Sequence, residues 1–355
     1  MAAMYEEILK NLEYISKTVG NPVEFTQGGG GNTSAKLSGE LMAVKASGYK
    51  LKQITPGEGY VVVNYKDIKG FFDSVDLSQD RDYEKESTEF VKGSIVEMGG
   101  LKKLRPSVEA GFHSFLKKYV IHTHSVYANM ICCTSNGEET VGKIFKDCEF
   151  GTAWVPYINP GFCLSLKIAE AVKKAANESG KYPDAIFMEN HGLIVSSDDA
   201  KKCVELHAEV NRRIREYLGI SGAFPSIELF TVDENTFISK TEYIADYFKN
   251  NRIREGFFDE TVLYPDQLVY LNGSISIDGM DKKLNINSKT GEIVYKTNSS
   301  EAQTIEETLL AYLYVVDGIK KSGLPLKTMS EKEIDFIRNW ESEAYRKSLV
   351  KELGK

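Results

Sequence analysis

The segment YVIHTHSVYANMICC, residues 119–133, decides how this chain folds. Its first part, Tyr119–Thr123, begins with an apolar run that predicts a buried strand, and Val126–Cys133 is typical of the start of a helix. Side chains two positions apart in a strand point to the same face of the sheet, so His122 and His124 can both reach one ion. The segment therefore predicts a strand that delivers two histidines to one place.

Around this strand, the pattern of apolar residues predicts further helices and strands. A helix is expected over residues 5–18, and the polar stretch 73–100 is expected to be a loop with short helical pieces. Strands and helices that mix without regular alternation favour a layered α/β or α+β core over a doubly wound sheet. The other expected strands are Ser34–Leu37, Leu41–Ala46, Tyr60–Asn64, Ala185–Glu189 and Leu193–Val195, and the other expected helices are Pro106–Lys118, Leu164–Ala175 and Asp199–Leu218.

Residues 224–355 differ in texture from residues 1–223, and we expect them to form a smaller α+β unit, called here the C-terminal extension. No role follows for it from its sequence. Its expected elements are hairpins over Leu268–Ile277 and Leu284–Tyr295, followed by helices over Glu301–Lys321 and Glu331–Leu353.

Composition excludes several classes of protein. The 355 residues are 42% hydrophobic and 27% charged, which is typical of a globular chain with a large core. The 44 Lys and Arg against 51 Asp and Glu give a net charge of −7, which argues against nucleic acid as a partner, because phosphates need a basic face. No apolar run is long enough to cross a membrane, and residues 1–20 do not resemble a signal peptide. Five irregularly spaced cysteines predict no disulfide framework, so we expect a cytoplasmic location.

A third histidine stands in a similar context to the first two. His191 lies in ENHG, residues 189–192, where another apolar strand runs into a glycine. Three imidazoles at strand ends suit Zn²⁺ and leave a position open for substrate, although manganese or cobalt would also be accepted. The alternative is that His122, His124 and His191 are three separately hydrogen-bonded histidines, and spacing alone leaves both interpretations open.

Glu109 is the candidate acid/base group. On the expected helix Pro106–Lys118 it lies four residues before His113, so the two side chains would share a face. A carboxylate near a divalent ion can bind it, or move a proton once substrate has displaced it. The alternative for a single glutamate on a helix is a solvated side chain. His113 and His207 are interpreted as packed core histidines.

The stretch QGGGGNTSAK, residues 27–36, is the third element with chemical meaning. Successive N–H groups of a glycine run can form an anion-binding nest, although neither a P-loop nor a dinucleotide fingerprint is present. Ser47-Gly48 follows an expected strand, and Ser107 begins the expected helix of Glu109. The three loops can therefore converge on one phosphate. As ordinary turns, they would carry no function.

Six short motifs, taken in order, resemble the class II aldolase/adducin family. The resemblance covers about residues 4–220 and is greatest to fuculose-phosphate and rhamnulose-phosphate aldolases, especially the aldolase halves of rhamnulose aldolase/dehydrogenase fusions. No single motif is decisive, but six in this order are strong together. They are Gly31-Asn32-Thr33-Ser34, Ala46-Ser47-Gly48, Pro106-Ser107-Val108-Glu109, His122-Thr123-His124-Ser125, Val155-Pro156-Tyr157 and Asn190-His191-Gly192-Leu193.

The resemblance implies a three-layer α/β/α domain and usually a C4 homotetramer with active sites between subunits. It also implies one zinc ion held by His122, His124 and His191, with Glu109 as the acid/base residue. One departure is Val108, where many of these aldolases have a second serine, so the phosphate pocket loses one hydroxyl. The substrate- and phosphate-binding loops of the family fall on Gly31, Asn32, Ser47, Gly48 and Ser107.

The activity that the resemblance implies is retro-aldol cleavage of a small-molecule carbohydrate, a ketose or ketose 1-phosphate. Zinc would stabilise the enediolate as a Lewis acid, and Glu109 would move the proton on the carbon nucleophile. A tyrosine would protonate the other fragment, and 19 tyrosines leave its identity open. Other members of the family are dehydratases, epimerases or decarboxylases, and adducin-like members are non-enzymatic interaction proteins that lack the metal histidines.

Overall fold

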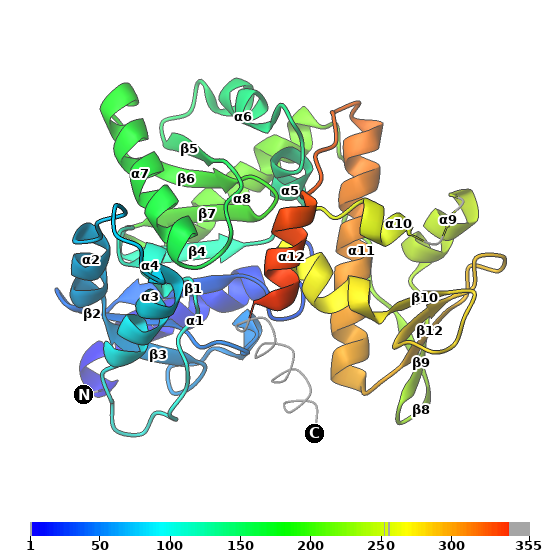
Figure 1. Ribbon diagram of the computed structural model, residues 1–355, viewed down its shortest axis with the longest axis horizontal. Helices are drawn as coiled ribbons and strands as arrows, with labels where there is room; N and C mark the ends of the chain where they lie inside the picture. Colours follow the sequence, from blue (N-terminus) through cyan, green and yellow to red (C-terminus); the bar gives the residue numbers. More distant parts are fainter. Residues whose placement is uncertain (1, 252, 255, 341–355) are drawn as a thin grey trace.

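The computed structural model describes residues 2–251, 253–254 and 256–340, and its N-terminal part is built around a seven-stranded sheet (Figure 1). The strands lie in the order β3-β2-β1-β4-β7-β6-β5, and every neighbouring pair is antiparallel except β5 and β6. The expected histidine strand is β4, at the centre of the sheet. The strand bounds are β1 Asn32–Lys36, β2 Leu41–Lys45, β3 Tyr60–Asn64, β4 Tyr119–Thr123, β5 Gly151–Val155, β6 Pro183–Met188 and β7 Gly192–Ser197.

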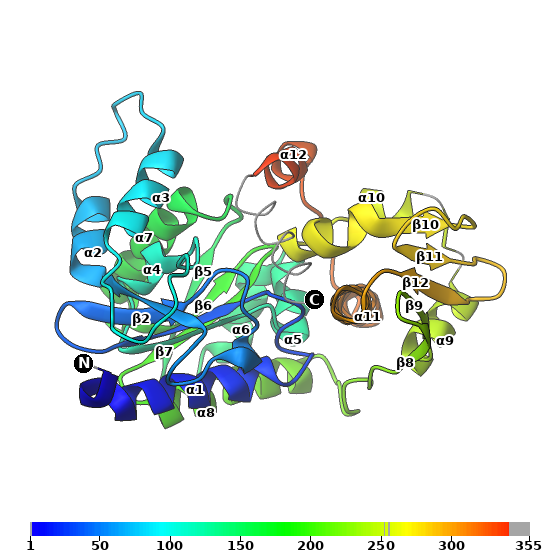
Figure 2. The same ribbon diagram turned by 90° about the horizontal axis from the view of Figure 1, so that it is seen from below.

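Helices cover both faces of this sheet (Figure 2). Helices α1 and α8 lie on one face, with α5 and α6 in contact with α8, and helices α2, α3, α4 and α7 lie on the other face. The expected three-layer α/β/α domain is therefore confirmed. The helix bounds are α1 Glu6–Gly20, α2 Tyr65–Asp73, α3 Tyr83–Gly93, α4 Ala110–His113, α5 Val126–Cys132, α6 Gly137–Phe145, α7 Phe162–Ser179 and α8 Ala200–Tyr217, with short 3₁₀ turns at Ala2–Tyr5 and Leu51–Gln53.

Alternation along β4 decides which way its histidines point. Ile121 packs into the core that α1 and α8 cover, whereas Val120 packs with residues of α7 on the other face. Thr123 lies two positions after Ile121 and points to the same face, where its hydroxyl lies 2.9 Å from Nε2 of His207 on α8. His122 therefore shares the face of Val120, on the α7 side of the sheet.

The predicted helix over Pro106–Lys118 is wrong. Only the four-residue α4 is helical there, and Glu109 is its N-cap rather than a member of a helix face. The chain before α4 is extended, because the backbone N–H of Ser107 donates to the carbonyl oxygen of Lys45 at the end of β2. Glu109 and His113 therefore do not share a helix face as predicted, and a different path brings them together.

Most other predicted elements of the N-terminal part are confirmed. The helix expected over residues 5–18 is α1, and the expected helix Asp199–Leu218 is α8, whose N-cap Asp199 accepts a hydrogen bond from the backbone N–H of Lys202. Helix α7 is longer than predicted, and α3 lies in the expected polar loop. The sequence analysis misses β5 and α6; β5 is short and partly exposed, so it carries little apolar signal.

The C-terminal extension carries its own five-stranded sheet, in the order β10-β11-β12-β9-β8. The hairpin predicted over Leu284–Tyr295 is confirmed as β11 and β12, which pair antiparallel. The sequence analysis misses the hairpin of β8 and β9. The bounds here are β8 Leu229–Asp233, β9 Thr236–Ser239, α9 Glu242–Asn250, α10 Phe257–Glu260, η3 Gln267–Leu271, η4 Asn272–Ser274, β10 Ile275–Ile277, β11 Leu284–Ile286 and β12 Ile293–Lys296.

The hairpin predicted over Leu268–Ile277 is wrong. The π-helical turn η3 and the 3₁₀ turn η4 occupy most of it, and only β10 is a strand, which pairs parallel to β11. The buried side chain of Gln267 explains the turn. It accepts a hydrogen bond from the backbone N–H of Leu263 and donates to the carbonyl oxygens of Phe258 and Thr261, so it holds the preceding chain in a compact loop.

Helix α11, Ser299–Lys321, stands between the two sheets (Figure 1). It packs against α5, where the rings of Tyr314 and Tyr127 meet edge to face with centroids 6.3 Å apart. One continuous apolar core contains residues of both parts of the chain. Helix α12, Glu331–Asn339, agrees with the start of the last predicted helix, of which residues 341–353 lie outside the described residues.

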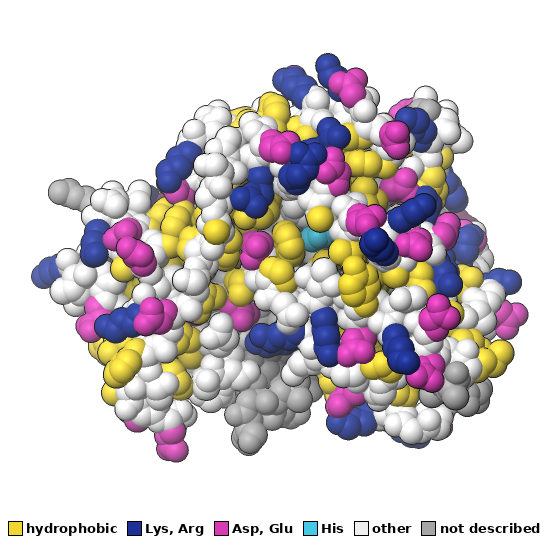
Figure 3. Space-filling view, turned by 180° about the vertical axis from the view of Figure 1, so that it is seen from behind, with side chains coloured by type: hydrophobic (Ala, Val, Ile, Leu, Met, Phe, Trp, Pro, Cys, Tyr) yellow, Lys and Arg dark blue, Asp and Glu magenta, His cyan; other side chains and the backbone are white. Residues whose placement is uncertain are grey.

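Charged side chains of both signs are interspersed over the face in Figure 3, with little histidine visible. All five histidines of the chain are in fact buried. The histidines are therefore core residues, and the groups that contact them decide their chemistry.

Among the described residues, no helix combines the length and apolar character that a membrane-spanning helix needs.

We expect the two parts of the chain to unfold together. Leu309 on α11 is fully buried in the shared core, so Leu309→Ala should lower the free energy of unfolding by about 2–5 kcal/mol through the cavity that it leaves. Urea unfolding followed by far-UV circular dichroism and by tryptophan fluorescence should give one coincident, shifted transition. Lys320→Ala, at an exposed position of the same helix, should leave the midpoint unchanged. Two separate transitions, with only one shifted, would contradict a shared core.

Candidate metal centre

The three histidines predicted as ligands come together at one end of the seven-stranded sheet. His122 and His124 lie at the end of β4, and His191 lies just before β7, the antiparallel neighbour of β4. One nitrogen of each ring lies within 4.8 Å of those of the other two, and the ring centroids are 4.9 to 5.2 Å apart. We call these three residues the histidine triad.

Hydrogen bonds fix which nitrogen of two rings faces the shared point. Nδ1 of His122 lies 3.0 Å from the carbonyl oxygen of Leu193, and Nδ1 of His124 lies 2.5 Å from Oδ2 of Asp266. Both partners accept hydrogen bonds, so each Nδ1 carries the proton and each Nε2 keeps its lone pair. The two Nε2 atoms lie 3.2 Å apart, with their lone pairs directed to the same place.

Burial keeps His122 uncharged at neutral pH. Desolvation is the largest effect and lowers the pKa of His122 to about 4; the Glu109 carboxylate opposes this shift and the His124 ring adds to it. A metal ion binds only the neutral form of imidazole. The ring is therefore in the form that a metal ligand requires.

The donor set of the triad fits a divalent cation. The 3.2 Å between the Nε2 atoms of His122 and His124 is close to the roughly 3.3 Å expected for two nitrogens bound tetrahedrally at about 2.0 Å. Two lone pairs at this distance repel each other unless a cation lies between them. The geometry thus favours metal ligation over the alternative of three separately hydrogen-bonded histidines.

Glu109 faces the triad. Its Oε1 lies 3.4 Å from Nε2 of His191, and its Oε2 lies 3.5 Å from Nε2 of His122. Asn32 on β1 holds the carboxylate in place, because its Nδ2 donates to Oε2 at 2.5 Å. Nε2 of His113 hydrogen-bonds Oδ1 of the same Asn32. His113 is buried, as predicted, and it also supports the residue that orients Glu109.

The predicted substrate loops line a cavity that opens onto the triad. The side-chain amide of Asn32 donates to Oγ of Ser107 over 3.3 Å, so β1 and the segment before α4 meet there. The structure thus brings all five predicted substrate residues to one cavity. Its lining contains Gly31, Asn32, Ser47, Gly48, Ser107, Val108, Glu109, His124 and His191.

Lys45 is a residue of this cavity that the sequence analysis misses. It lies on β2 and is only 3% exposed, and its Nζ donates to the carbonyl oxygen of Gly29 at 3.4 Å. A buried ammonium is costly unless it has polar or charged partners, so this lysine adds a strongly polar group to the wall of the cavity. The sequence feature that could have indicated Lys45 is its position in an otherwise apolar strand.

The C-terminal extension closes one wall of the same cavity. Pro265 and Asp266 line it from the segment before η3, and Trp340 lines it after α12. Asp266 is also the residue that hydrogen-bonds His124. No local motif marks these three positions, so the sequence analysis could not include them in the site.

The glycine run packs closely against its neighbours. The backbone N–H of Gly28 donates to Oε2 of Glu307 on α11 at 2.8 Å. Gly31 has φ +66°, and a Cβ on it would lie 2.6 Å from the carbonyl oxygen of His122. The N–H of Gly28 is therefore bound to a carboxylate of the chain itself, whereas in an anion-binding nest it would be open to a phosphate.

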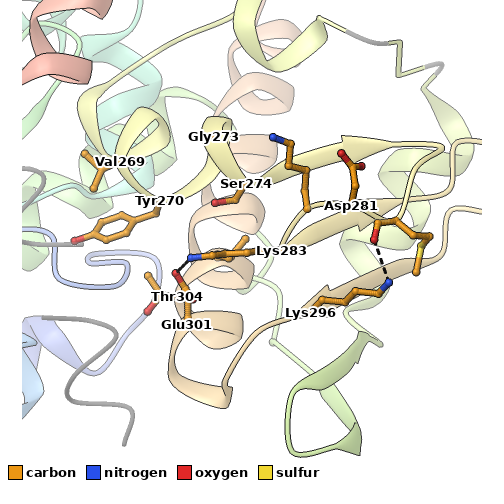
Figure 4. A pocket seen from close by; sticks show the side chains of 12 residues that line it. Val269, Tyr270, Gly273, Ser274, Asp281, Lys283, Lys296, Glu301 and Thr304 are labelled. Atoms are coloured by element: carbon orange, nitrogen blue, oxygen red, sulfur yellow. Dashed lines mark hydrogen bonds and ion pairs between the residues drawn. The ribbon is translucent and has the colours of Figure 1, made fainter. Parts of the chain in front are cut away.

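A second, wider cavity lies within the C-terminal extension (Figure 4). Its described lining contains no histidine. Lys283 pairs with Glu301, and Lys296 donates to the carbonyl oxygen of Met280 over 3.0 Å. The two cavities have no described lining residue in common, so this one is not part of the candidate metal centre.

Comparison with known families gives a match over more than half of the chain. A sequence profile described as "Class II Aldolase and Adducin N-terminal domain" matches residues 21–218. A protein of Bacillus subtilis (strain 168) described as "Uncharacterized oxidoreductase YuxG" is 28% identical over 226 residues. That alignment covers 61% of this chain and 30% of the relative, so the chain spans about a third of the curated relative that it matches.

Solved structures with a similar arrangement come from several organisms. The N-terminal Class II Aldolase domain of a conserved protein from Thermoplasma acidophilum is 25% identical, with a TM-score of 0.49, over 59% of this chain and 93% of that chain. L-fuculose 1-phosphate aldolase from Glaciozyma antarctica PI12 is 14% identical, with a TM-score of 0.40, over 60% of this chain and 73% of that chain.

We expect acid to destabilise the fold through its buried histidines. Burial lowers the pKa of His113 and of His207 to about 3, from 6.5 for a free side chain. Between these pH values the unfolded state binds more protons, so the free energy of unfolding is highest above pH 6.5 and falls toward pH 3. Each ring contributes about 1.4 kcal/mol per pH unit within this window.

His207→Gln should remove one ring's share of this slope, because glutamine does not titrate there. Urea unfolding at a series of pH values between about 4 and 6.5 measures the slope. Lys201→Ala, at an exposed position of the same helix, should keep the wild-type slope. An equal slope in wild type and His207→Gln would contradict the lowered pKa of His207.

Proposed function

The chain belongs to the class II aldolase/adducin family, and we propose that it is a metal-dependent lyase that cleaves a ketose 1-phosphate by retro-aldol chemistry. The profile match over residues 21–218 supports the family. The oxidoreductase description of the curated relative gives no reaction to this chain, because the chain covers only 30% of that protein.

The observation that carries the proposal is the meeting of three imidazoles and one carboxylate at a buried point. His122, His124 and His191 offer one nitrogen each within 4.8 Å, and Glu109 lies 3.4 and 3.5 Å from two of them. Burying these polar groups together costs free energy of folding, and a non-enzymatic, adducin-like interaction protein would gain nothing from them. The arrangement therefore supports an enzyme.

The proposed mechanism divides the work between the triad and Glu109. A divalent cation held by His122, His124 and His191 would supply Lewis-acid stabilisation of the negative charge that cleavage leaves on the enediolate. Cleavage requires that the hydroxyl which becomes the new carbonyl lose a proton and that the enediolate carbon gain one. Glu109 would take up a proton as its carboxylate and deliver it, as the acid, to that carbon, for which its side chain must stay directed at the substrate. The hydrogen bond from Asn32 provides that direction.

The cavity lining supports a phosphorylated substrate. Ser47 and Ser107 offer hydroxyl donors, and Lys45 adds a positive charge near them. A charge-assisted hydrogen bond from lysine is stronger than one from a neutral hydroxyl. Lys45 thus offsets the serine hydroxyl that is lost at Val108.

We propose zinc as the metal, since three imidazoles with an open position form a common zinc site. By family resemblance we also propose a homotetramer with active sites between subunits. A cytoplasmic location is part of the proposal, because all five cysteines of the chain are free thiols. Elemental analysis of the purified protein tests the zinc assignment, and the mass of the protein in solution tests the homotetramer.

We expect two substitutions to separate metal binding from turnover. His122→Ala should remove both the metal and the activity, because it deletes one of three ligands. Glu109→Gln should retain the metal but lower kcat by about 10²- to 10⁴-fold, because the amide cannot carry the proton. Metal content by elemental analysis, and release of dihydroxyacetone phosphate or lactaldehyde from a panel of ketose phosphates, provide the two measurements.

Glu139→Gln, at an exposed position on α6, is the matched control and should behave as wild type. Unchanged metal content in His122→Ala would contradict the ligand assignment. Loss of water, inversion at a carbon, or release of carbon dioxide from a keto acid, in place of cleavage products, would replace the aldolase by another reaction of the family.

We expect Lys45→Met to distinguish phosphorylated from unphosphorylated substrates. Loss of a charge-assisted contact of about 1.5–3 kcal/mol should raise KM for a ketose 1-phosphate about 10- to 100-fold. The kcat/KM for the unphosphorylated ketose should not change. Lys50→Met is the control, because the nearby Lys50 directs its Nζ to Thr304 on α11, 3.3 Å away. An equal loss for both substrates would show that Lys45 has a different role.

A further inference from the structure

Asp266 joins the C-terminal extension to the histidine triad. Its Oδ2 lies 2.5 Å from Nδ1 of His124, and the two residues are 142 positions apart in the sequence. Asp266 is 1% exposed and His124 is 5% exposed, so the contact is made away from solvent. A charge-assisted hydrogen bond of this kind is short and strong.

The contact engages the side of the ring that the triad does not use. Nε2 of His124 faces Nε2 of His122, and Nδ1 is the other nitrogen of the same ring. A carboxylate on Nδ1 holds the proton there and keeps the lone pair on Nε2. It also fixes the rotation of the ring and raises its basicity as a ligand.

Gly30 leaves room for this hydrogen bond. A Cβ on Gly30 would lie 2.4 Å from Oδ2 of Asp266 and 2.8 Å from Nδ1 of His124. Any side chain at this position would therefore push the carboxylate and the ring apart. The glycine run accordingly has a steric role at the point where Asp266 meets His124.

Further hydrogen bonds hold Asp266 against the triad. The neighbouring Gln267 binds three backbone groups of the extension, which fixes the loop that carries Asp266. Next to the ligand His191, the side chain of Asn190 donates to the carbonyl oxygens of Leu263 and Lys327, at 2.8 and 2.9 Å. The extension is thus attached beside two of the three triad residues.

We propose that Asp266 of the C-terminal extension is a positioning residue for His124, so that the extension completes the metal centre. The inference rests on the metal site of the proposed function. It gives residues 224–340 a part in the chemistry, because the family domain alone does not supply the carboxylate that orients this ring.

The test measures metal affinity in the full-length protein, in addition to activity. Asp266→Asn keeps a hydrogen-bond acceptor of the same size but removes the charge, and Asp266→Ala removes both. Zn²⁺ affinity by competition with a chelator should fall about 10- to 100-fold in both variants, more in the alanine variant. The visible absorption spectrum of the Co²⁺-loaded protein should change, because it reports the geometry of the ligands.

Asp259→Asn is the matched control, since it removes the same charge from an exposed position of the extension, where Asp259 pairs with Arg338 at 3.2 Å. Its affinity and Co²⁺ spectrum should equal those of wild type. Gly30→Ala provides an independent variant, because it displaces the carboxylate without removing it, and it should lower the affinity as Asp266→Asn does. Gly30→Ala therefore still tests the proposal if Asp266→Ala fails to fold.

The possible outcomes distinguish this inference from the proposed function. If wild type binds metal and all Asp266 and Gly30 variants bind it equally well with unchanged spectra, Asp266 has only a structural role and the inference is overturned. If wild type binds no divalent metal, the proposed function itself fails. A loss of affinity confined to the Asp266 and Gly30 variants supports the positioning role.

Discussion

Three buried imidazoles must turn one nitrogen each toward a single point, and the sheet is arranged so that they can. β4 and β7 are antiparallel neighbours, with His122 opposite Ile194 and Thr123 opposite Leu193. The end of β4 therefore meets the start of β7, and the residues just outside the pairing, His124 and His191, meet as well. Neither strand alone holds more than two of the rings, so the pairing itself makes the site.

This convergence depends on the hydrogen bonds of the opposite ring nitrogens. The carbonyl oxygen of Leu193 accepts a hydrogen bond from Nδ1–H of His122, and the carboxylate of Asp266 accepts one from Nδ1–H of His124. If either proton moved to Nε2, that ring would present a donor to the shared point and no longer a lone pair. The same reasoning applies to Glu109, which Asn32 orients and His113 supports in turn. These hydrogen bonds thus orient the ring nitrogens of the triad and the carboxylate of Glu109.

The sequence predicts the parts of this site that depend on local pattern. His122 and His124 were found because a strand places alternate residues on one face, and His191 because a strand runs into a glycine. Glu109 is predicted from its spacing to His113 on an expected helix and from its position in a family motif, but the helix is wrong, because the pairing of Ser107 with Lys45 keeps that segment extended. Asp266 lies 142 residues from its partner, two residues before the segment Leu268–Ile277 for which the pattern predicts a hairpin. Contacts between distant segments of this kind leave no period or spacing to detect.

The glycine run connects these observations. A nest for phosphate needs backbone N–H groups that are open to a ligand, yet Gly28 donates to Glu307, and the space beside Gly30 is filled by Asp266 and His124. Two carboxylates of the C-terminal extension therefore occupy the region where the nest was expected. The proposed phosphate contacts are therefore those of Ser47, Ser107 and Lys45, which line the cavity. Because the glycines fit the extension so closely, the run is best explained as a surface on which the extension packs, and the contact of Gly30 with His124 places this surface beside the histidine triad.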